Sequence, residues 1–445
     1  MSLVASLEKR IVSSSFRDPS GFVYWQNGEL YRQINPCYRE NYKRLMESGL
    51  YNELVGNKLL VHHKQVSEDT IVPDIIPFVS YPYEWCFSQL KDAALATLAT
   101  QKTAMDFGMT LKDASAYNIQ FLRGQPVLID TLSFATYQEG KPWIPYRQFC
   151  QYFLNPLALM ALKDIRLSQL LRVYIDGIPI DLTAKLLPSK TYFNPGLLTH
   201  IKTHALSQNH LAGKKLPIRM SKTMLTNFVN NLENTVKNLR WKPKGNWVNY
   251  SQCSYSEIAQ RSKQDIVTEY LVRLKPKLVW DLGANNGLFS DIAAGTGAEV
   301  IALDSDPACV ELCYQKYKGK ILPLVVDLIN PTPSIGWRNE ERVGLLERNK
   351  PDTVMALAFI HHLAISNNLP LKEIASFLDS LCNNLIVEWV PKDDLQVQKM
   401  LSTREDIFVD YNQSNFEDKF EAHFRVIERQ SIMDSARTLY LMERR

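Results

Sequence analysis

The chain has 445 residues, of which 45% are hydrophobic and 22% are charged, and it carries a net charge of +4 at pH 7. This length predicts two or three globular domains. The weak basic excess gives no indication of nucleic-acid binding. No apolar run is as long as a membrane-spanning helix, which needs about 20 residues. Because the seven cysteines form no Cys-x-x-Cys pair and the first residues lack a secretory pattern, we expect a reduced, cytoplasmic protein without a membrane segment.

The first elements along the chain predict a mixed α+β domain. Two β-rich runs flank an Asn-Gly turn within residues 22–34, which is typical of a hairpin. A helical run follows at Tyr38–Leu54, then a strand at Ile75–Ser80 and a long helix at Glu84–Met105. We place this domain at residues 1–205.

A spaced set of polar side chains follows the long helix. Asp113 precedes Asn118 by five residues, and Asp130 follows Asn118 by twelve. This spacing resembles that of kinase-like folds, especially small-molecule phosphotransferases, which use a catalytic Asp, a metal-binding Asn and a second metal-binding Asp after a short hairpin. The resemblance covers residues 20–200 and implies ATP and Mg²⁺ as ligands.

Three departures separate this half from an active kinase. No Gly-rich nucleotide loop precedes the hairpin, Arg32 stands where a strand lysine is expected, and Thr-Leu rather than Phe-Gly follows Asp130. We therefore expect a degenerate kinase-like fold that binds a substrate or a partner. An active phosphotransferase that uses Asp113, Asn118 and Asp130 is one alternative, and an unrelated α+β domain with coincidental acids is another.

The rest of the chain has a different pattern. Residues 206–246 are polar and rich in Lys and Asn, which predicts a linker or a helical bridge. Within 247–445 short apolar strands alternate with helices, and this predicts a parallel sheet covered on both faces, closed by an antiparallel hairpin. The predicted strands are Lys277–Leu282, Glu299–Asp304, Ile321–Leu328, Thr353–Phe359, Asn384–Val390, Phe424–Ile432 and Arg437–Met442, and the predicted helices include Glu257–Leu274, Pro307–Tyr317 and Leu371–Cys382.

A Gly-rich turn, Asp281–Gly287, joins the first of these strands to a helix. Such a turn lets backbone amides approach a polar ligand closely. A nicotinamide-type fingerprint would need Gly at 285 and 288. The turn instead resembles motif I of the class I S-adenosylmethionine (SAM) dependent methyltransferases, Asp/Glu-x-Gly-x-Gly-x-Gly, with Gly283 and Gly287 in place and Asn285, which tolerates left-handed backbone, at the middle Gly. The resemblance implies a Rossmann-like α/β sheet of seven strands and SAM as the cofactor.

Three acids, Asp281, Asp304 and Asp327, each close a predicted strand at intervals of 23 residues. Ligands of open α/β sheets bind beyond the carboxyl ends of the strands, so these side chains are expected to converge. By the resemblance, Asp304 binds the ribose hydroxyls, Asp327 contacts the adenine amino group and Asp281 acts near the methionine amino group. Each acid taken alone also fits a helix cap or a turn, and Asp306, which competes with Asp304, is interpreted as a cap.

The candidate catalytic side chains follow the fourth and fifth strands. His361 and His362 lie where family members hold the transferable methyl group, and histidine titrates near neutrality, so one of them is the candidate base; a structural histidine pair is the alternative. Glu388 is a candidate to bind substrate or to orient a histidine, or it is a solvated strand-end acid. Lys263 or Tyr255 is a further candidate for cofactor contact, unless both belong to an ordinary capped helix. No spacing indicates a catalytic metal in this half.

Together these patterns predict a SAM-dependent methyltransferase that acts on an O or N atom of its acceptor. The chain lacks the Asn/Asp-Pro-Pro-Tyr/Phe motif of enzymes that methylate adenine N6 or glutamine side chains. The modest charge favours a small molecule or a glycan as acceptor and leaves nucleic acid open; the oligomeric state is not indicated. The alternatives are a bifunctional protein with phosphotransfer in the N-terminal half, and a non-catalytic SAM-binding scaffold.

Overall fold

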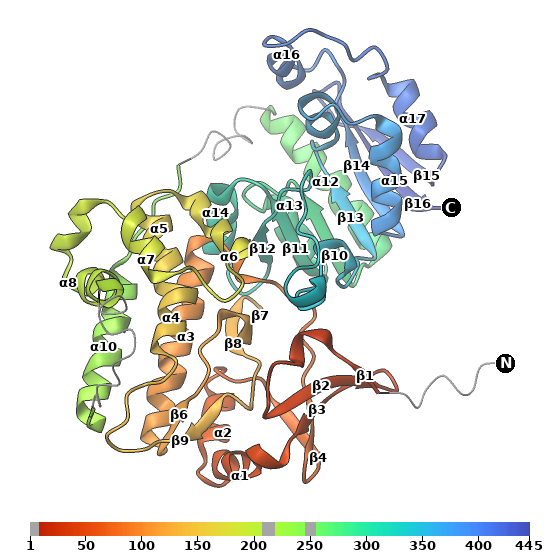
Figure 1. Ribbon diagram of the computed structural model, residues 1–445. Helices are drawn as coiled ribbons and strands as arrows, with labels where there is room; N and C mark the ends of the chain where they lie inside the picture. Colours follow the sequence, from red (N-terminus) through yellow and green to blue (C-terminus); the bar gives the residue numbers. More distant parts are fainter. Residues whose placement is uncertain (1–8, 207–218, 245–254) are drawn as a thin grey trace. The chain divides into compact units, whose positions relative to one another are not determined.

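The computed structural model describes residues 9–206, 219–244 and 255–445 and divides the chain into two compact units (Figure 1). Unit 1 comprises Met1–Lys242 together with Ser334–Val343, and unit 2 comprises Pro243–Pro333 and Gly344–Arg445. None of the helices in the described ranges combines the length and the apolar character that crossing a bilayer requires.

Unit 1 begins with a five-stranded antiparallel sheet in the order β1-β2-β3-β5-β4. The predicted hairpin is present as β2 and β3, because Asn27 and Gly28 adopt the positive φ angles, 54° and 81°, that a two-residue turn needs. The helical run after it forms two helices, since Gly49 at φ 85° begins a new one. The strands are β1 Arg10–Ile11, β2 Gly21–Gln26, β3 Glu29–Ile34, β4 His63–Ser67 and β5 Thr70–Pro73, and the helices are α1 Arg39–Glu47 and α2 Leu50–Gly56.

The strand predicted at Ile75–Ser80 is wrong, and two strands before it, β4 and β5, were not predicted. Pro77, in the middle of this segment, lacks the amide hydrogen that a strand interior donates. The backbone of Ser80 bonds instead to a side chain, because its N–H donates to Gln120 Oε1 and its carbonyl accepts from Gln120 Nε2, both at 2.9 Å. This segment is therefore an irregular connection before the long helix.

The remainder of unit 1 is mainly helical around the long helix α3, Phe87–Asp106, and two short strand pairs. Helix α10, Lys222–Asn238, occupies much of the predicted linker, buries Leu225, Val229 and Leu232, and belongs to unit 1, so that unit extends to residue 242. The strand pairs are β6 Met109–Leu111 with β9 Phe134–Thr136, and β7 Ile119–Leu122 with β8 Gln125–Leu128; the helices are α4 Tyr146–Phe149, α5 Asn155–Leu162, α6 Leu170–Val173, α7 Ile180–Leu186 and α8 Pro195–Leu197.

Unit 2 is built on a seven-stranded sheet in the order β12-β11-β10-β13-β14-β16-β15. The first five strands are parallel and the last two form the antiparallel hairpin. This arrangement confirms the predicted methyltransferase-like α/β fold. The strands are β10 Leu278–Leu282, β11 Glu299–Asp304, β12 Leu322–Val325, β13 Thr353–Ala356, β14 Asn384–Trp389, β15 Phe424–Ser431 and β16 Thr438–Arg444; the helices are α12 Glu257–Leu274, α13 Leu288–Gly295, α14 Pro307–Tyr317, α15 Leu371–Leu381, α16 Leu395–Leu401 and α17 Gln413–Glu421.

Along each strand the side chains point alternately to the two faces of the sheet, and helices cover both faces (Figure 1). In β16, Leu439 and Leu441 pack in one core with residues of α12, α13 and α14. Tyr440, between them, points to the opposite face, where its ring lies 5.2 Å from that of Phe416 in α17. Both faces of the sheet are therefore covered, and the carboxyl ends of its parallel strands remain as the edge at which a ligand site forms.

Candidate functional site

The Gly-rich loop between β10 and α13 makes a tight left-handed path. Gly283, Asn285 and Gly287 have φ angles of 72°, 50° and 84°. A Cβ atom on Gly283 would lie 2.8 Å from Phe359 Cδ2, and one on Gly287 would lie 2.3 Å from Cys313 Sγ. Both glycines are thus required by backbone angle and by space, whereas Asn285 takes the left-handed conformation that its side chain tolerates.

Asp304, the last residue of β11, ties this loop to the loop that follows β11. Its Oδ2 accepts a hydrogen bond from the Asn285 amide, and its Oδ1 accepts one from the Asp306 amide, both at 2.8 Å. Burial raises the pKa of Asp304 to about 6. Asp306 accepts from the Ala308 amide at the start of α14 and is therefore the helix cap that the sequence predicted.

The other two acids are placed differently from each other. Asp281 lies inside β10, where it is buried and accepts a hydrogen bond from Ser290 Oγ at 2.6 Å; burial raises its pKa to about 6. The third strand ends at Val325 rather than at 328, so Asp327 lies in the turn beyond it, exposed, and accepts from the Ile329 amide at 3.0 Å. The prediction that Asp327 closes the third strand is wrong, because the strand ends two residues earlier.

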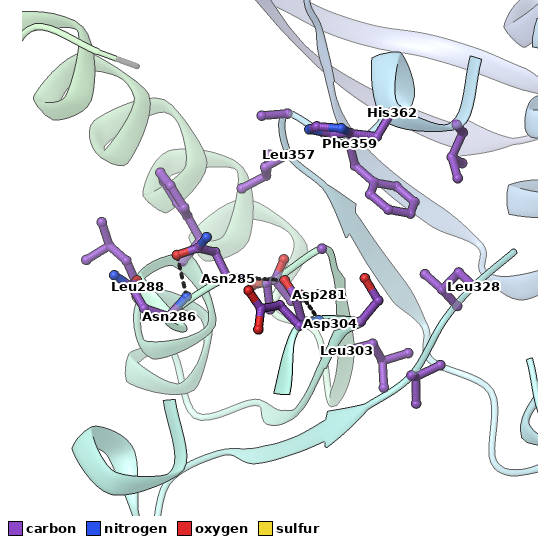
Figure 2. A pocket seen from close by; sticks show the side chains of 18 of the residues that line it. Asp281, Asn285, Asn286, Leu288, Leu303, Asp304, Leu328, Leu357, Phe359 and His362 are labelled. Carbon is purple, nitrogen blue, oxygen red and sulfur yellow. Dashed lines mark hydrogen bonds between the residues drawn. The ribbon is translucent and has the colours of Figure 1, made fainter. Parts of the chain in front are cut away.

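A cavity of about 360 Å³ lies at the carboxyl ends of β10 to β13 and brings these acids together (Figure 2). Figure 2 shows Asp281, Asn285 and Asp304 on one side and Phe359 with His362 across from them. Its volume falls within the range of small-molecule sites. The lining residues are Tyr255, Gln260, Lys263, Asp281, Gly283–Asn286, Leu288, Phe289, Leu303–Asp306, Val326–Ile329, Leu357–Phe359, His362, Leu363, Ser366 and Asn367.

Of the two candidate histidines, only His362 lines the cavity. Burial, followed by the charge of Arg437, lowers its pKa to about 4, so its imidazole is neutral at physiological pH. His361 is fully buried, with its ring 4.2 Å from that of His362, and neither of its ring nitrogens has a hydrogen-bond partner among the described residues. Burial holds the pKa of His361 well below its usual value.

Glu388 lies behind the cavity wall in a buried charge network. Its carboxylate is 2.6 Å from the Lys263 ammonium and 3.3 Å from the Arg437 guanidinium, and it accepts from the Tyr255 hydroxyl at 2.6 Å. Burial acts to raise the pKa of Glu388, but the two cations outweigh it and the pKa is lowered. The alternative of a solvated strand-end acid is therefore wrong. Arg437 is held in turn by Asp394, 2.8 Å from its Nε.

Tyr255 and Lys263, the two residues that the sequence offers for cofactor contact, belong to this network and line the cavity. The Tyr255 ring lies between the two cations, 4.7 Å from Lys263 Nζ and 4.4 Å from the Arg437 guanidinium. Residues 245–254, which precede Tyr255, lie outside the described residues. The partners that sequence reasoning missed are Arg437 and Ser290, because nothing in a local pattern indicates which distant strand or helix supplies a buried countercharge.

In unit 1 the structure brings the kinase-like candidates together. Arg32 lies 2.6 Å from Asp130 Oδ1, which also accepts from the Leu132 amide, while Asp130 Oδ2 accepts from Ser133 Oγ at 2.7 Å. Asn118 Nδ2 donates to the same Ser133 hydroxyl at 3.4 Å. Asp113 accepts from the Ser115 amide, and burial followed by the charge of Asp130 raises its pKa. Within the described ranges, no group of three His, Cys, Asp or Glu side chains is placed to hold a metal ion.

Comparison with known proteins gives one extended relationship. No family model matches the chain. The nodulation protein NoeA of Rhizobium meliloti (strain 1021) is 34% identical over 458 residues, which cover 97% of this chain and 96% of that protein. The chain belongs to the NoeA family.

The solved structures that resemble the chain share little sequence with it. Magnesium protoporphyrin IX methyltransferase (ChlM) from Synechocystis PCC 6803 with bound SAM is 18% identical over 46% of this chain and 87% of its own, with a TM-score of 0.31. The N-methyltransferase NodS from Bradyrhizobium japonicum WM9 is 10% identical over 42% and 98%, with a TM-score of 0.32. The bifunctional kinase-methyltransferase WbdD is 18% identical over 42% of this chain but only 40% of its own, with a TM-score of 0.30. The fold of unit 2 is identified by the strand order of its own sheet.

Proposed function

We propose that unit 2 is a SAM-dependent methyltransferase domain that binds its cofactor in the cavity at the ends of β10 to β13. The observation that carries this proposal is Asp304, whose carboxylate lines the cavity at the end of β11 while two backbone amides hold it in place. A carboxylate in that position can accept from both hydroxyls of a ribose. Fold alone does not imply this chemistry; the side chains that line the cavity support it.

The residues around the cavity fit the different parts of SAM. Asp281 offers a buried negative charge to the ammonium group, and Asp327 beyond β12 offers an acceptor to the adenine amino group. The amide nitrogen of Gln260 lines the same cavity, buried and without a hydrogen-bond partner in the described part of the chain. A buried donor left unpaired is costly, and a polar ligand would satisfy it.

On the acceptor side, His362 is the proposed base. Bound SAM would supply a methyl group on a sulfonium: an O or N nucleophile would bond to the methyl carbon as the carbon–sulfur bond breaks, with S-adenosylhomocysteine leaving as a neutral thioether. The His362 imidazole lines the cavity and is neutral, so its ring is able to accept a proton from the nucleophile, although a pKa of about 4 makes it a weaker base than an ordinary histidine. Phe359, Leu363, Ser366 and Asn367 form the adjoining wall. This wall combines apolar side chains with the Ser366 hydroxyl and the Asn367 amide, so it suits a small molecule or a glycan better than a polyanion.

Titration calorimetry with SAM tests the cofactor site. Asp304→Asn removes the charge and leaves one acceptor oxygen for the two ribose hydroxyls; because a hydrogen bond to a charged group contributes about 1.5–3 kcal/mol, affinity should fall by roughly 10- to 10²-fold. Asp291→Asn is the matched control, because Asp291 in α13 does not line the cavity and pairs with Lys320; this change should alter SAM affinity less than about threefold. A folded wild-type protein that gives no heat with SAM would refute the proposal.

A non-catalytic SAM-binding scaffold is the second candidate for the same cavity. It predicts SAM binding of the same strength with no methyl transfer to any acceptor. Incubation with methyl-labelled SAM and fractionated glycans and metabolites separates the two, since the methyltransferase yields a labelled product that His362→Phe abolishes while SAM affinity is retained.

For unit 1 we propose a kinase-like fold that binds a substrate or partner without transferring phosphate. Asp130, the candidate metal ligand, is already paired with the Arg32 guanidinium at 2.6 Å, a positive charge that competes directly with a metal ion for the carboxylate. Differential scanning fluorimetry with Mg²⁺ and ATP should therefore show no stabilisation. A thermal shift that is lost in Asp130→Ala would favour the phosphotransferase instead.

A further inference from the structure

The tyrosine and phenylalanine rings that line the cavity of unit 2 differ in what lies against them. The Tyr255 ring has the Lys263 ammonium 4.7 Å from its centre and the Arg437 guanidinium 4.4 Å from it. The Phe289 ring has the Lys263 ammonium at 4.6 Å. Phe359 also lines the cavity, but within the described ranges no lysine or arginine lies over its ring. The electron-rich face of Phe359 is therefore available to a cation that a ligand brings.

A sharp turn after β13 places Phe359 on the Gly-rich loop. Ala358 has a φ of 50°, a left-handed conformation that is uncommon for a residue other than glycine. A Cβ atom on Gly283 would lie 2.8 Å from Phe359 Cδ2, so the ring touches the backbone of that glycine. The rest of the ring is partly exposed, toward the cavity that it lines. Backbone strain of this kind clusters at binding sites, where the surrounding structure maintains it. The turn thus fixes the ring at one place in the cavity wall.

Gly283 lies between the two proposed anchors of the cofactor. Asp281 precedes it at the end of β10, and Asn285 follows it in the loop and donates its amide to Asp304 Oδ2 at 2.8 Å. In SAM the sulfur joins the ribose to the amino-acid chain. With the ribose hydroxyls at Asp304 and the ammonium at Asp281, the sulfur would lie between these two carboxylates, beside Gly283 and the ring that rests on it.

The same turn carries the proposed base. The Phe359 carbonyl accepts a hydrogen bond from the His362 amide at 3.0 Å, and the short helical turn His362–Ser366 follows. Asn367 Nδ2 donates to the His362 carbonyl at 3.0 Å and closes that turn. Figure 2 shows Phe359 and His362 on the side of the cavity across from the acids of the cofactor loop. Phe359 therefore adjoins both the Gly-rich loop and the acceptor wall, and the methyl-bearing sulfur must lie where these two meet.

We propose that Phe359 is a specificity-determining residue that recognises the positive charge of the sulfonium and so distinguishes SAM from its demethylated product, S-adenosylhomocysteine (SAH). The inference rests on the proposed function, because it concerns the ligand of the same cavity. The face of an aromatic ring attracts a cation, whereas the thioether of SAH is neutral. Asp281 and Asp304 are proposed to bind groups that SAM and SAH share, so they hold both ligands. Loss of the methyl group weakens only the contact with Phe359 and favours the exchange of SAH for SAM.

Calorimetric titration of the full chain with SAM and, separately, with SAH tests this role. Phe359→Leu keeps an apolar side chain but removes the ring, so the ratio of SAM affinity to SAH affinity should fall by roughly 3- to 10-fold. Phe289→Leu is the matched control, because that ring also lines the cavity but already faces Lys263. Whatever its effect on the two affinities, both should change alike, and their ratio should stay within about twofold of the wild-type value.

A second set of variants keeps the shape of the ring. Phenylalanine with one, two or three ring fluorines, incorporated at position 359, has a progressively weaker negative face, so the ratio should fall in steps with the number of fluorines. These variants keep the test decisive if leucine destabilises the turn after β13, because their side chains fill nearly the same volume. Melting curves show whether each variant is folded at the temperature of the titration.

The outcomes separate this inference from the proposed function. Binding of both ligands with an unchanged ratio in Phe359→Leu and in the fluorinated series would overturn the role of Phe359 and leave the methyltransferase proposal intact. Equal losses of the two affinities would mean that the ring only packs on Gly283, which also overturns it. No heat with either ligand from the folded wild type would refute the proposed function and this inference with it.

Discussion

Replacing Gly287 by Ala tests the geometry of the Gly-rich loop quantitatively. An alanine at φ 84° carries left-handed strain of about 1–2 kcal/mol. Its Cβ would also lie 2.3 Å from Cys313 Sγ and 3.2 Å from the Tyr317 ring, and forced overpacking costs about 1–3 kcal/mol. We expect Gly287→Ala to lower the free energy of unfolding by roughly 2–5 kcal/mol in total.

Two further variants separate strain from overlap. Gly297 has φ 94° with nothing within 4 Å of a built Cβ, so Gly297→Ala should carry only the strain. Cys313→Ala removes the overlapping sulfur, and the double variant should recover about 1–2 kcal/mol relative to the sum of the single changes. Urea unfolding followed by tryptophan fluorescence, with unchanged slopes, measures each value. Equal costs for Gly287→Ala and Gly297→Ala, or no coupling with Cys313→Ala, would refute the reasoning.

Two other predictions concern the charges around the cavity. Burial raises the pKa of both Asp304 and Asp281 to about 6, so both carboxylates are ionised above that pH and protonated below it. Calorimetry should show SAM affinity falling roughly ten- to hundredfold per unit as pH drops below 6, and Asp304→Asn should leave a shallower fall of about tenfold per unit. A flat wild-type profile from pH 7.5 to 5 would exclude Asp304 as the ribose ligand. Glu388→Gln leaves the buried cations Lys263 and Arg437 short of a countercharge, so it should lower the free energy of unfolding by about 3–5 kcal/mol. Glu428→Gln is the control: Glu428 is 30% exposed and pairs with Arg273, so its loss should cost under about 1 kcal/mol. Equal costs in urea unfolding would contradict a structural role for the network.

The sequence predicted unit 2 more closely than unit 1. Glu299–Asp304, Pro307–Tyr317 and Glu257–Leu274 have the bounds that their patterns indicate. Buried parallel strands are apolar throughout and are bounded by capped helices, so the local sequence pattern alone marks where each strand and helix of unit 2 begins and ends. In unit 1 the exposed strand β4 shows little periodicity, and Ile75–Ser80 is apolar without being a strand.

For the site, sequence by itself determined the Gly-rich loop, Asp281 near the end of β10 and Asp304 at the end of β11, because a left-handed turn and a strand end are local properties of the chain. Only the tertiary structure decided that His362 lines the cavity while His361 is buried behind it, and that Glu388 is neutralised by Lys263 and Arg437. Likewise, nothing local predicts that residues 334–343 pack in the N-terminal unit. Burial and countercharge depend on residues far apart in the chain, and those partners are set by packing rather than by any pattern that a single segment carries.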